Sequence, residues 1–95
     1  MSKGYWVVKA NIEDLKEYSK YIEKATLVVD KFKGNFLIRG GDQTDKENKG
    51  FERTVVVEFC SYSRAKDCYE SSEYQSALNH AKNSANRIFT VVEGI

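Results

Sequence analysis

The chain has 95 residues, which is the length of one domain, since domains span about 50–250 residues, and we expect residues 1–95 to form a single one. Fifteen lysines and arginines against fourteen aspartates and glutamates give a formal charge of +1, so no net field draws the chain to nucleic acid or to an anionic membrane. Hydrophobic residues make up 41% and aromatic residues 13% of the sequence, which excludes a disordered chain.

The first predicted elements are a strand and a helix. Residues 5–10 are β-branched and aromatic, with apolar side chains at both parities, as in a strand that is covered on both faces. Asn11 is predicted to cap the helix that follows, and Gly34 is predicted to end it. The predicted buried stripe of this helix has spacings of three and four residues and consists of Leu15, Tyr18, Ile22, Ala25, Val29 and Phe32.

The middle of the chain predicts two paired strands. Residues 36–39 form a short apolar strand that Gly40 and Gly41 end, and residues 42–50 form a polar loop without periodicity. Residues 51–59 contain Thr-Val-Val-Val, the strongest strand signal in the sequence. We therefore expect the two strands to pair antiparallel across the loop.

The last third predicts a broken helix and a final strand. Ser63 is expected to cap a helix that runs to about residue 70, and Ser72 to cap a second helical piece. The final strand is predicted at residues 88–92. The predicted inward residues of the two helical pieces are Ala65, Cys68, Tyr69, Tyr74, Ala77, Leu78 and Ala81.

The resulting order is β-α-β-β-α-β, which predicts an α+β fold of the ferredoxin-like type. In this plan both helices cover one face of a four-stranded antiparallel sheet. Because the strands are apolar at both parities, the other face would expose an apolar patch, and we expect a homodimer that packs sheet to sheet.

The sequence also allows predictions about the location of the protein in the cell and about metal binding. The N-terminus lacks the apolar stretch of a signal peptide, and there is no run of about 18 apolar residues, so we expect a cytoplasmic protein without membrane association. Cys60 and Cys68 form no CxxC motif, and His80 is the only histidine, which is too little for a zinc site or a disulfide framework. We expect reduced, structural thiols, no metal and no cofactor.

Several short motifs, taken in order, resemble those of a known family. They are Gly4-Tyr5-Trp6, Gly34 before Phe36-Leu37-Ile38-Arg39-Gly40-Gly41, Arg53 with Val55-Val56-Val57-Glu58-Phe59, Tyr69 with Ser71-Ser72-Glu73-Tyr74-Gln75, and Val92-Glu93-Gly94. Nearly the whole chain resembles the "domain of unknown function 1330" family. The resemblance implies a dimeric α+β barrel and no established reaction. This chain departs from the family pattern at Ser72, where a proline is common, and near Ala81, where an arginine is common.

Charged residues inside predicted strands are candidates for function, since burying an unpaired ion is costly. Strand parity places Arg53 and Glu58 on opposite faces. Arg39 precedes two glycines, so its guanidinium could hold a ligand carboxylate in a bidentate fork. The alternative for Arg39 is a structural ion pair with Glu58, with Glu93 or across a dimer. The charged residues in predicted strands are Lys9, Arg39, Arg53, Glu58 and Glu93.

A pocket between helix and sheet with tyrosine walls suits a small apolar or carboxylate-bearing ligand. No nucleophile stands out, so no catalytic residue is assigned. His80 has polar neighbours and is predicted to face solvent. The ligand-binding candidates are Arg39, Arg53, Glu58, Tyr18, Tyr69 and Tyr74.

These observations leave three hypotheses for function. The first is a cytoplasmic homodimer that binds a small organic ligand and that could be a cofactor-independent enzyme. The second is a non-catalytic structural or interaction dimer. The third is a haem-binding or haem-degrading monooxygenase in which His80 holds the iron. Nucleic acid and membranes are not expected partners.

Overall fold

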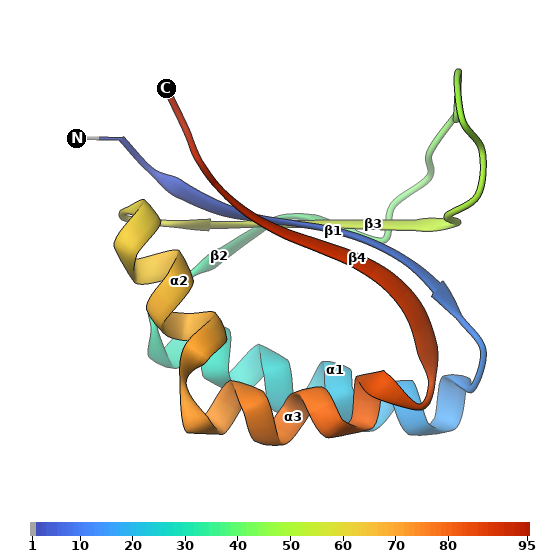
Figure 1. The fold of residues 1–95 in the computed structure, drawn as a ribbon, viewed down its shortest axis with the longest axis horizontal. Helices are drawn as coiled ribbons and strands as arrows, with labels where there is room; N and C mark the ends of the chain where they lie inside the picture. Colours follow the sequence, from blue (N-terminus) through green and yellow to red (C-terminus); the bar gives the residue numbers. More distant parts are fainter. Residues whose placement is uncertain (1) are drawn as a thin grey trace.

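Three helices cover one face of a four-stranded antiparallel sheet (Figure 1). The computed structural model describes residues 2–95, and the strand order is β2-β3-β1-β4. This arrangement confirms the predicted ferredoxin-like α+β fold, including the break in the second helix. In chain order the elements are β1 (Gly4–Ile12), α1 (Leu15–Lys31), β2 (Asn35–Arg39), β3 (Arg53–Phe59), α2 (Tyr62–Glu70), α3 (Ser72–Lys82) and β4 (Ala85–Glu93).

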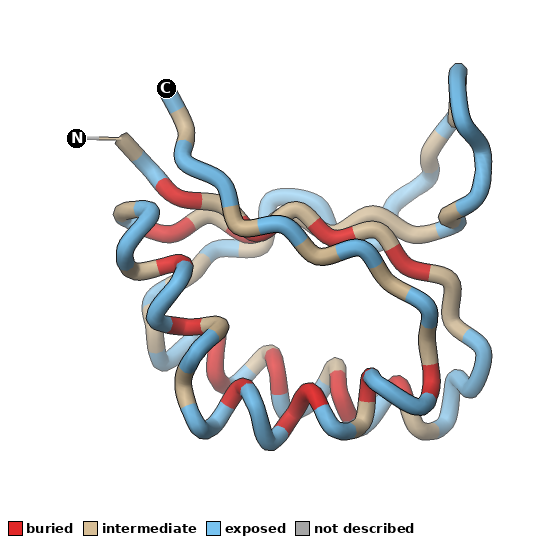
Figure 2. Tube along the Cα trace, viewed as in Figure 1, coloured by how far each residue is buried: buried red, intermediate tan, exposed pale blue. Residues whose placement is uncertain are grey.

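The two faces of the sheet differ in burial, and buried residues alternate with less buried ones along the strands (Figure 2). Trp6, Val8 and Ala10 of β1 face the helices and are at most 5% exposed. On the opposite face, which we call the open face, Ile38, Ile88 and Val92 are exposed. The open face therefore carries exposed apolar surface.

The core is built around the indole of Trp6, which is 2% exposed. The ring centroids of Tyr74 and Phe89 both lie 5.0 Å from the Trp6 ring, and that of Phe59 lies at 5.1 Å. The indole Nε1 donates a hydrogen bond to the Ala65 carbonyl of α2 at 2.9 Å. This one side chain thus joins the sheet to both α2 and α3.

The start of α1 differs from the prediction. Asp14, not Asn11, is the N-cap, and its carboxylate accepts the Glu17 N–H at 3.1 Å. The prediction is wrong because β1 continues to Ile12. Asn11 instead holds the loop before β3: its side chain accepts the Glu52 N–H at 2.9 Å and donates to the Gly50 carbonyl.

The buried stripe of α1 is also turned relative to the predicted one. Tyr21 and Val28 are buried, whereas Leu15 is 65% exposed. At the end of the helix Lys33 adopts the left-handed conformation, with φ of 59°, and not Gly34. Gly34 is needed for space, since a Cβ there would lie 2.8 Å from the Phe59 ring.

Ser61 and Ser71 are the N-caps of α2 and α3, each one or two residues before the predicted caps Ser63 and Ser72. The Ser71 hydroxyl accepts the Tyr74 N–H at 3.1 Å. Ser72 is therefore the first residue of α3, a position where proline is favoured but not required. A serine at this position therefore leaves the break between α2 and α3 intact.

The strand β4 begins at Ala85, three residues before the predicted start, and ends at Glu93. The Ser84 carbonyl, just before the strand, accepts the N–H groups of Glu13 and Asp14 at 2.8 and 3.0 Å. This cross-connection fixes where the strand begins. The longer strand includes Arg87, which the sequence prediction left outside.

Cys60 is exposed, Cys68 is buried, and both are free thiols. Burial raises the pKa of the Cys68 thiol to about 12, so it is an unreactive core residue at neutral pH. Within residues 2–95 no three histidine, cysteine, aspartate or glutamate side chains are grouped so that they could hold a metal ion. Within the same residues, no helix has both the length and the apolar character needed to cross a membrane.

Gly4 is required where β1 passes under the start of α2. A Cβ at this position would lie 2.5 Å from the Tyr62 Cα and 2.6 Å from the Ser61 carbonyl carbon, and these backbone atoms cannot rotate away. We expect Gly4→Ala to lower the free energy of unfolding by about 1–3 kcal/mol in urea denaturation. Gly50→Ala is the control, because a Cβ there meets nothing within 4 Å. Equal stability of the two variants would contradict this packing.

Candidate functional site

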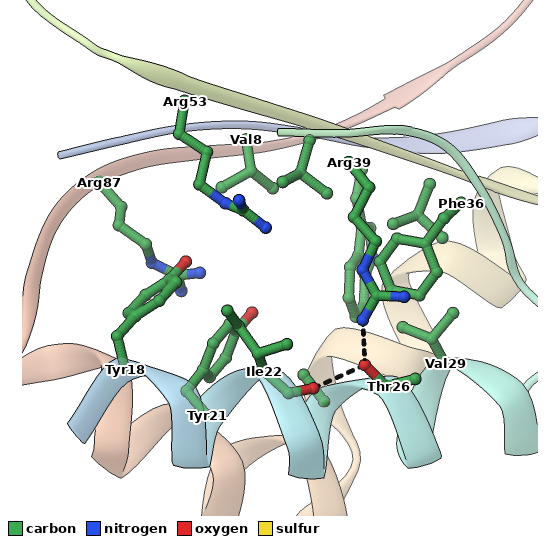
Figure 3. A pocket seen from close by; sticks show the side chains of 14 residues that line it. Val8, Tyr18, Tyr21, Ile22, Thr26, Val29, Phe36, Arg39, Arg53 and Arg87 are labelled. Carbon is green, nitrogen blue, oxygen red and sulfur yellow. Dashed lines mark hydrogen bonds between the residues drawn. The ribbon is translucent and has the colours of Figure 1, made fainter. Parts of the chain in front are cut away.

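A cavity lies between α1 and the helix-facing side of the sheet (Figure 3). Residues of α1 and of all four strands line it. Its volume is about 40 Å³, enough for a few water molecules, since one water needs about 10–15 Å³ of such space. The lining residues are Trp6, Val8, Tyr18, Tyr21, Ile22, Ala25, Thr26, Val29, Phe36, Arg39, Arg53, Val55, Val57 and Arg87.

Three arginines, Arg39 of β2, Arg53 of β3 and Arg87 of β4, line this cavity. The strand register explains why they meet. Arg53 is paired with Ala10 of β1, and Ala10 is paired with Arg87, so both arginines lie in one row across the sheet on either side of a small residue. Arg39 is paired with Val55, on the same face of the sheet.

Neutral groups hold two of these guanidinium groups in place. That of Arg39 lies 4.0 Å from the Phe36 ring centroid and donates to the Thr26 hydroxyl. The guanidinium carbon of Arg87 lies 4.7 Å from the Tyr21 ring centroid, and Nη2 donates to the Tyr74 hydroxyl at 3.3 Å. Their positions are therefore fixed without neutralisation of their charge.

The guanidinium group of Arg53 rests against Gly40, whose φ is +72°. A Cβ at Gly40 would lie 2.8 Å from the Arg53 Cζ, so any larger residue would displace this arginine. The Arg53 Nε and the Arg87 Nη1 are buried and have no hydrogen-bond partner. Among residues 2–95 none of the ion pairs involves an arginine, so the cavity carries positive charge that no acidic side chain balances.

A pair of tyrosine hydroxyls, those of Tyr21 and Tyr74, lies 2.8 Å apart beside Arg87. The Tyr74 oxygen accepts from Arg87, and Tyr74 is completely buried, so its own proton has an acceptor only if it is donated to Tyr21. The Tyr21 proton is then free to be donated into the cavity that Tyr21 lines.

The protonation states fit this arrangement. Burial raises the pKa of Tyr21, an effect that the nearby Arg87 partly opposes, and burial also raises the pKa of Tyr74. Burial by itself would lower the pKa of Arg87, but the two phenol oxygens outweigh it and the pKa is raised. At neutral pH the cavity therefore presents a cationic Arg87 and a protonated Tyr21.

The structure brings together only some of the predicted ligand-binding residues. Tyr18, Arg39 and Arg53 line the cavity. Glu58 lies on the open face, where its carboxylate accepts the Tyr5 hydroxyl at 3.2 Å. The predicted alternative of an ion pair between Arg39 and Glu58 is wrong within one chain, because the two lie on opposite faces of the sheet.

Two other candidates lie next to the cavity without lining it. Tyr74 is behind Tyr21 and contacts it through the hydroxyl pair. Tyr69 lines a second, outer groove of about 350 Å³ between α3 and β4. Arg87 borders both spaces, and it was missed because the predicted strand began at residue 88. Its parity with Phe89 and Val91, both partly buried, was the signal that could have found it.

His80 does not face solvent as predicted. Its side chain is 28% exposed, and Nδ1 lies 2.6 Å from the Glu17 carboxylate, because α3 packs alongside α1. The hydrogen bonds from His80 and Lys20 lower the pKa of Glu17. His80 lines neither the cavity nor the outer groove.

The pair of His80 and Glu17 predicts a pH dependence. Folding lowers the pKa of the Glu17 carboxyl group. The ionised carboxylate therefore stabilises the folded protein at pH values above the pKa of glutamate in the unfolded chain. This stabilisation is lost as the pH falls through the pKa of Glu17 in the folded protein. We expect Glu17→Gln to be less stable than the wild type at about pH 6, and the difference to be smaller near pH 3. Urea denaturation at both pH values measures this. A difference that is the same at both would contradict the pairing.

Comparison with known proteins identifies a family whose sequence pattern matches the chain and solved structures that share its fold. The family described as "Domain of unknown function (DUF1330)" matches residues 3–95. No curated protein sequence matches the chain. A solved protein of unknown function from Rhodopseudomonas palustris superposes with a TM-score of 0.81 at 9% identity, covering 99% of this chain and 83% of that one.

Two further solved structures share the fold. One is described as a dimeric protein of unknown function with a ferredoxin-like fold from Bacteroides fragilis (TM-score 0.65, 13% identity, covering 96% of this chain and 95% of that one). The other is SnoaB from Streptomyces nogalater, described as a cofactor-independent oxygenase (TM-score 0.62, 4% identity, covering 97% and 92%). At these identities the likeness extends to the fold alone.

Proposed function

This chain belongs to the DUF1330 family, and we propose that it binds a small organic acid in the cavity between α1 and the sheet. The ligand is held through carboxylate contacts to guanidinium groups of the cavity, which belong to Arg39, Arg53 and Arg87. Its organic part lies against the aromatic and aliphatic walls, which include Trp6 and Phe36.

The observation that carries this proposal is the uncompensated positive charge of the cavity, above all that of the partly buried Arg53 and Arg87. Leaving buried ions unpaired is costly, and proteins normally pair them. Here every hydrogen-bond or ring partner of Arg39 and Arg87 is neutral, and a buried N–H of Arg53 and another of Arg87 have no acceptor. A carboxylate supplies the missing negative charge, and it supplies the missing acceptors once the lining side chains have moved to admit it.

The size of the cavity sets a condition on binding. Pockets for organic ligands usually have about 300 Å³ or more, whereas this one has about 40 Å³. An organic acid therefore enters only if α1 or the lining side chains move outward. The lining includes long side chains such as Arg39, which is exposed and can change rotamer to admit a ligand.

A thermal-shift screen of organic acids, each compared with its uncharged amide, tests the proposal. An acid at about 100 times its dissociation constant should stabilise the protein by about 2.7 kcal/mol, and the amide should not. Stabilisation by none of the acids, or equal stabilisation by the amides, would contradict the proposal.

We also propose that the protein is a cytoplasmic homodimer whose subunits pack through the open face. The exposed apolar side chains of this face support it, as does the description of the Bacteroides fragilis structure as dimeric. This leaves open a non-catalytic dimer, but the arginines turned away from the open face argue for a ligand.

The variant Ile88→Asp tests whether the protein dimerises through the open face. Ile88 is 53% exposed on this face, so Ile88→Asp would place a charge in the apolar contact and is expected to yield monomers in light scattering. Leu27→Asp is the control, since Leu27 is 70% exposed on α1, away from the sheet. A monomeric wild type, or a dimer that Ile88→Asp leaves intact, would contradict this interface.

A cofactor-independent enzyme acting on the bound acid is the second candidate. The free Tyr21 proton favours it, because a fixed donor beside Arg87 would stabilise negative charge that develops on a ligand oxygen. Consumption of the bound acid, followed by NMR, distinguishes an enzyme from a binding protein. The haem hypothesis gains no support, since His80 contacts Glu17 and not the cavity.

A further inference from the structure

Two arginines that line the cavity, and that a strand separates, each carry a buried N–H group without a hydrogen-bond partner. The Arg53 Nε on β3 and the Arg87 Nη1 on β4 are both buried without an acceptor, and β1 lies between these strands. Neighbouring strands lie about 4.8 Å apart, so the Cα atoms of the two arginines are about 9–10 Å apart. The row between them contains only the small side chain of Ala10.

Each of these guanidinium groups is held separately. Arg87 lies over the rings of Tyr21 and Phe89, at 4.7 and 5.3 Å, and donates to Tyr74. Arg53 lies against Gly40. Two cationic groups that contact different elements, on either side of a small residue, form two anion positions.

The charge count leads to the same conclusion. One carboxylate would neutralise one of the two inner arginines and leave the other partly buried and unpaired. Arg39 differs from both, because it is exposed and water screens its charge. The inner part of the cavity therefore matches two negative charges.

We propose that the ligand is a dicarboxylic acid, with one carboxylate on Arg53, the other on Arg87, and its body over Ala10. This rests on the proposed function and narrows its substrate class. The Tyr21 hydroxyl, beside Arg87 and free to donate, gives the second carboxylate a further hydrogen bond.

Matched ligands test this in the wild type. Malonate, succinate and glutarate are each compared with their monomethyl esters by isothermal titration calorimetry at one ionic strength, with inorganic phosphate as a compact dianion. At least one diacid should bind about tenfold or more tightly than its ester and than phosphate, because the ester lacks one charge-assisted pair. Arg53→Met and Arg87→Met should each reduce the affinity for that diacid to the level of its ester.

Three results would overturn the inference. If the esters bind as tightly as the diacids, the site takes a single carboxylate, and the proposed function stands while this inference fails. Tighter binding of phosphate than of every diacid would indicate one dianionic position. Binding of no diacid and no ester would contradict the proposed function as well. The comparison of ligands needs no variant, so it holds even if a variant is unstable.

Discussion

Arg87→Met is expected to weaken the binding of the tightest organic acid by about 10- to 100-fold. Hydrogen bonds to charged groups contribute about 1.5–3 kcal/mol, and each 1.4 kcal/mol corresponds to a tenfold change in affinity. The variant removes the buried Nη1 that has no acceptor in the protein. Titration calorimetry with variant and wild type measures the change.

The same variant should keep its fold. Arg87 has no acidic partner, and after its removal Tyr74 still donates its proton to Tyr21. We expect the free energy of unfolding to change by less than about 1 kcal/mol, since replacing a buried ion by an apolar side chain is often neutral or stabilising.

Arg64→Met is the matched control for Arg87→Met. Arg64 also lies over an aromatic ring, that of Phe32 at 4.9 Å, but it does not line the cavity. Its loss should leave the affinity for the acid unchanged. If Arg87→Met binds the acid as tightly as Arg64→Met does, the arginines of the cavity do not hold the ligand.

Trp6→Ala should produce the largest loss of stability, about 3–5 kcal/mol in urea denaturation. The indole packs against the rings of Phe59, Tyr74 and Phe89, and its removal leaves a void at the junction of the sheet and two helices. The total free energy of unfolding of a domain is about 5–15 kcal/mol, so a loss of this size would bring the variant close to unfolding.

Trp6→Phe separates packing from hydrogen bonding. It keeps an aromatic ring but leaves the Ala65 carbonyl without its donor, so a smaller loss, about 1–3 kcal/mol, is expected. Tyr62→Ala serves as the control, since Tyr62 is 37% exposed and its truncation opens no void in the core. A loss for Trp6→Ala no larger than that for Tyr62→Ala would show that the core is not centred on Trp6.

The fold could be predicted because the patterns that encode it are local. The period of the apolar residues in α1 and the Thr-Val-Val-Val run in β3 each specify an element by neighbours along the chain. The caps were misplaced because Asn11 and Asp14 are equally good capping residues. Which one caps α1 depends on the length of β1, and this is fixed by its pairing with β4.

The candidate site was predictable only in part. Parity along one strand was enough to separate Arg53 from Glu58. The convergence of Arg53 and Arg87 depends on two strand registers that share Ala10, and the sequence of a single strand does not contain this information. Likewise, the hydroxyls of Tyr21 and Tyr74 meet across 53 positions in the chain.

The central claim is that guanidinium groups inside the cavity hold a carboxylate, and NMR of the arginine side chains tests it most directly. When the tightest acid is titrated into labelled protein, the Nε–H resonances of Arg53 and Arg87 should shift together, with the dissociation constant that calorimetry gives, while that of Arg64 stays in place. Binding of the acid with no shift at Arg53 or Arg87, or with shifts confined to the open face, would contradict the claim.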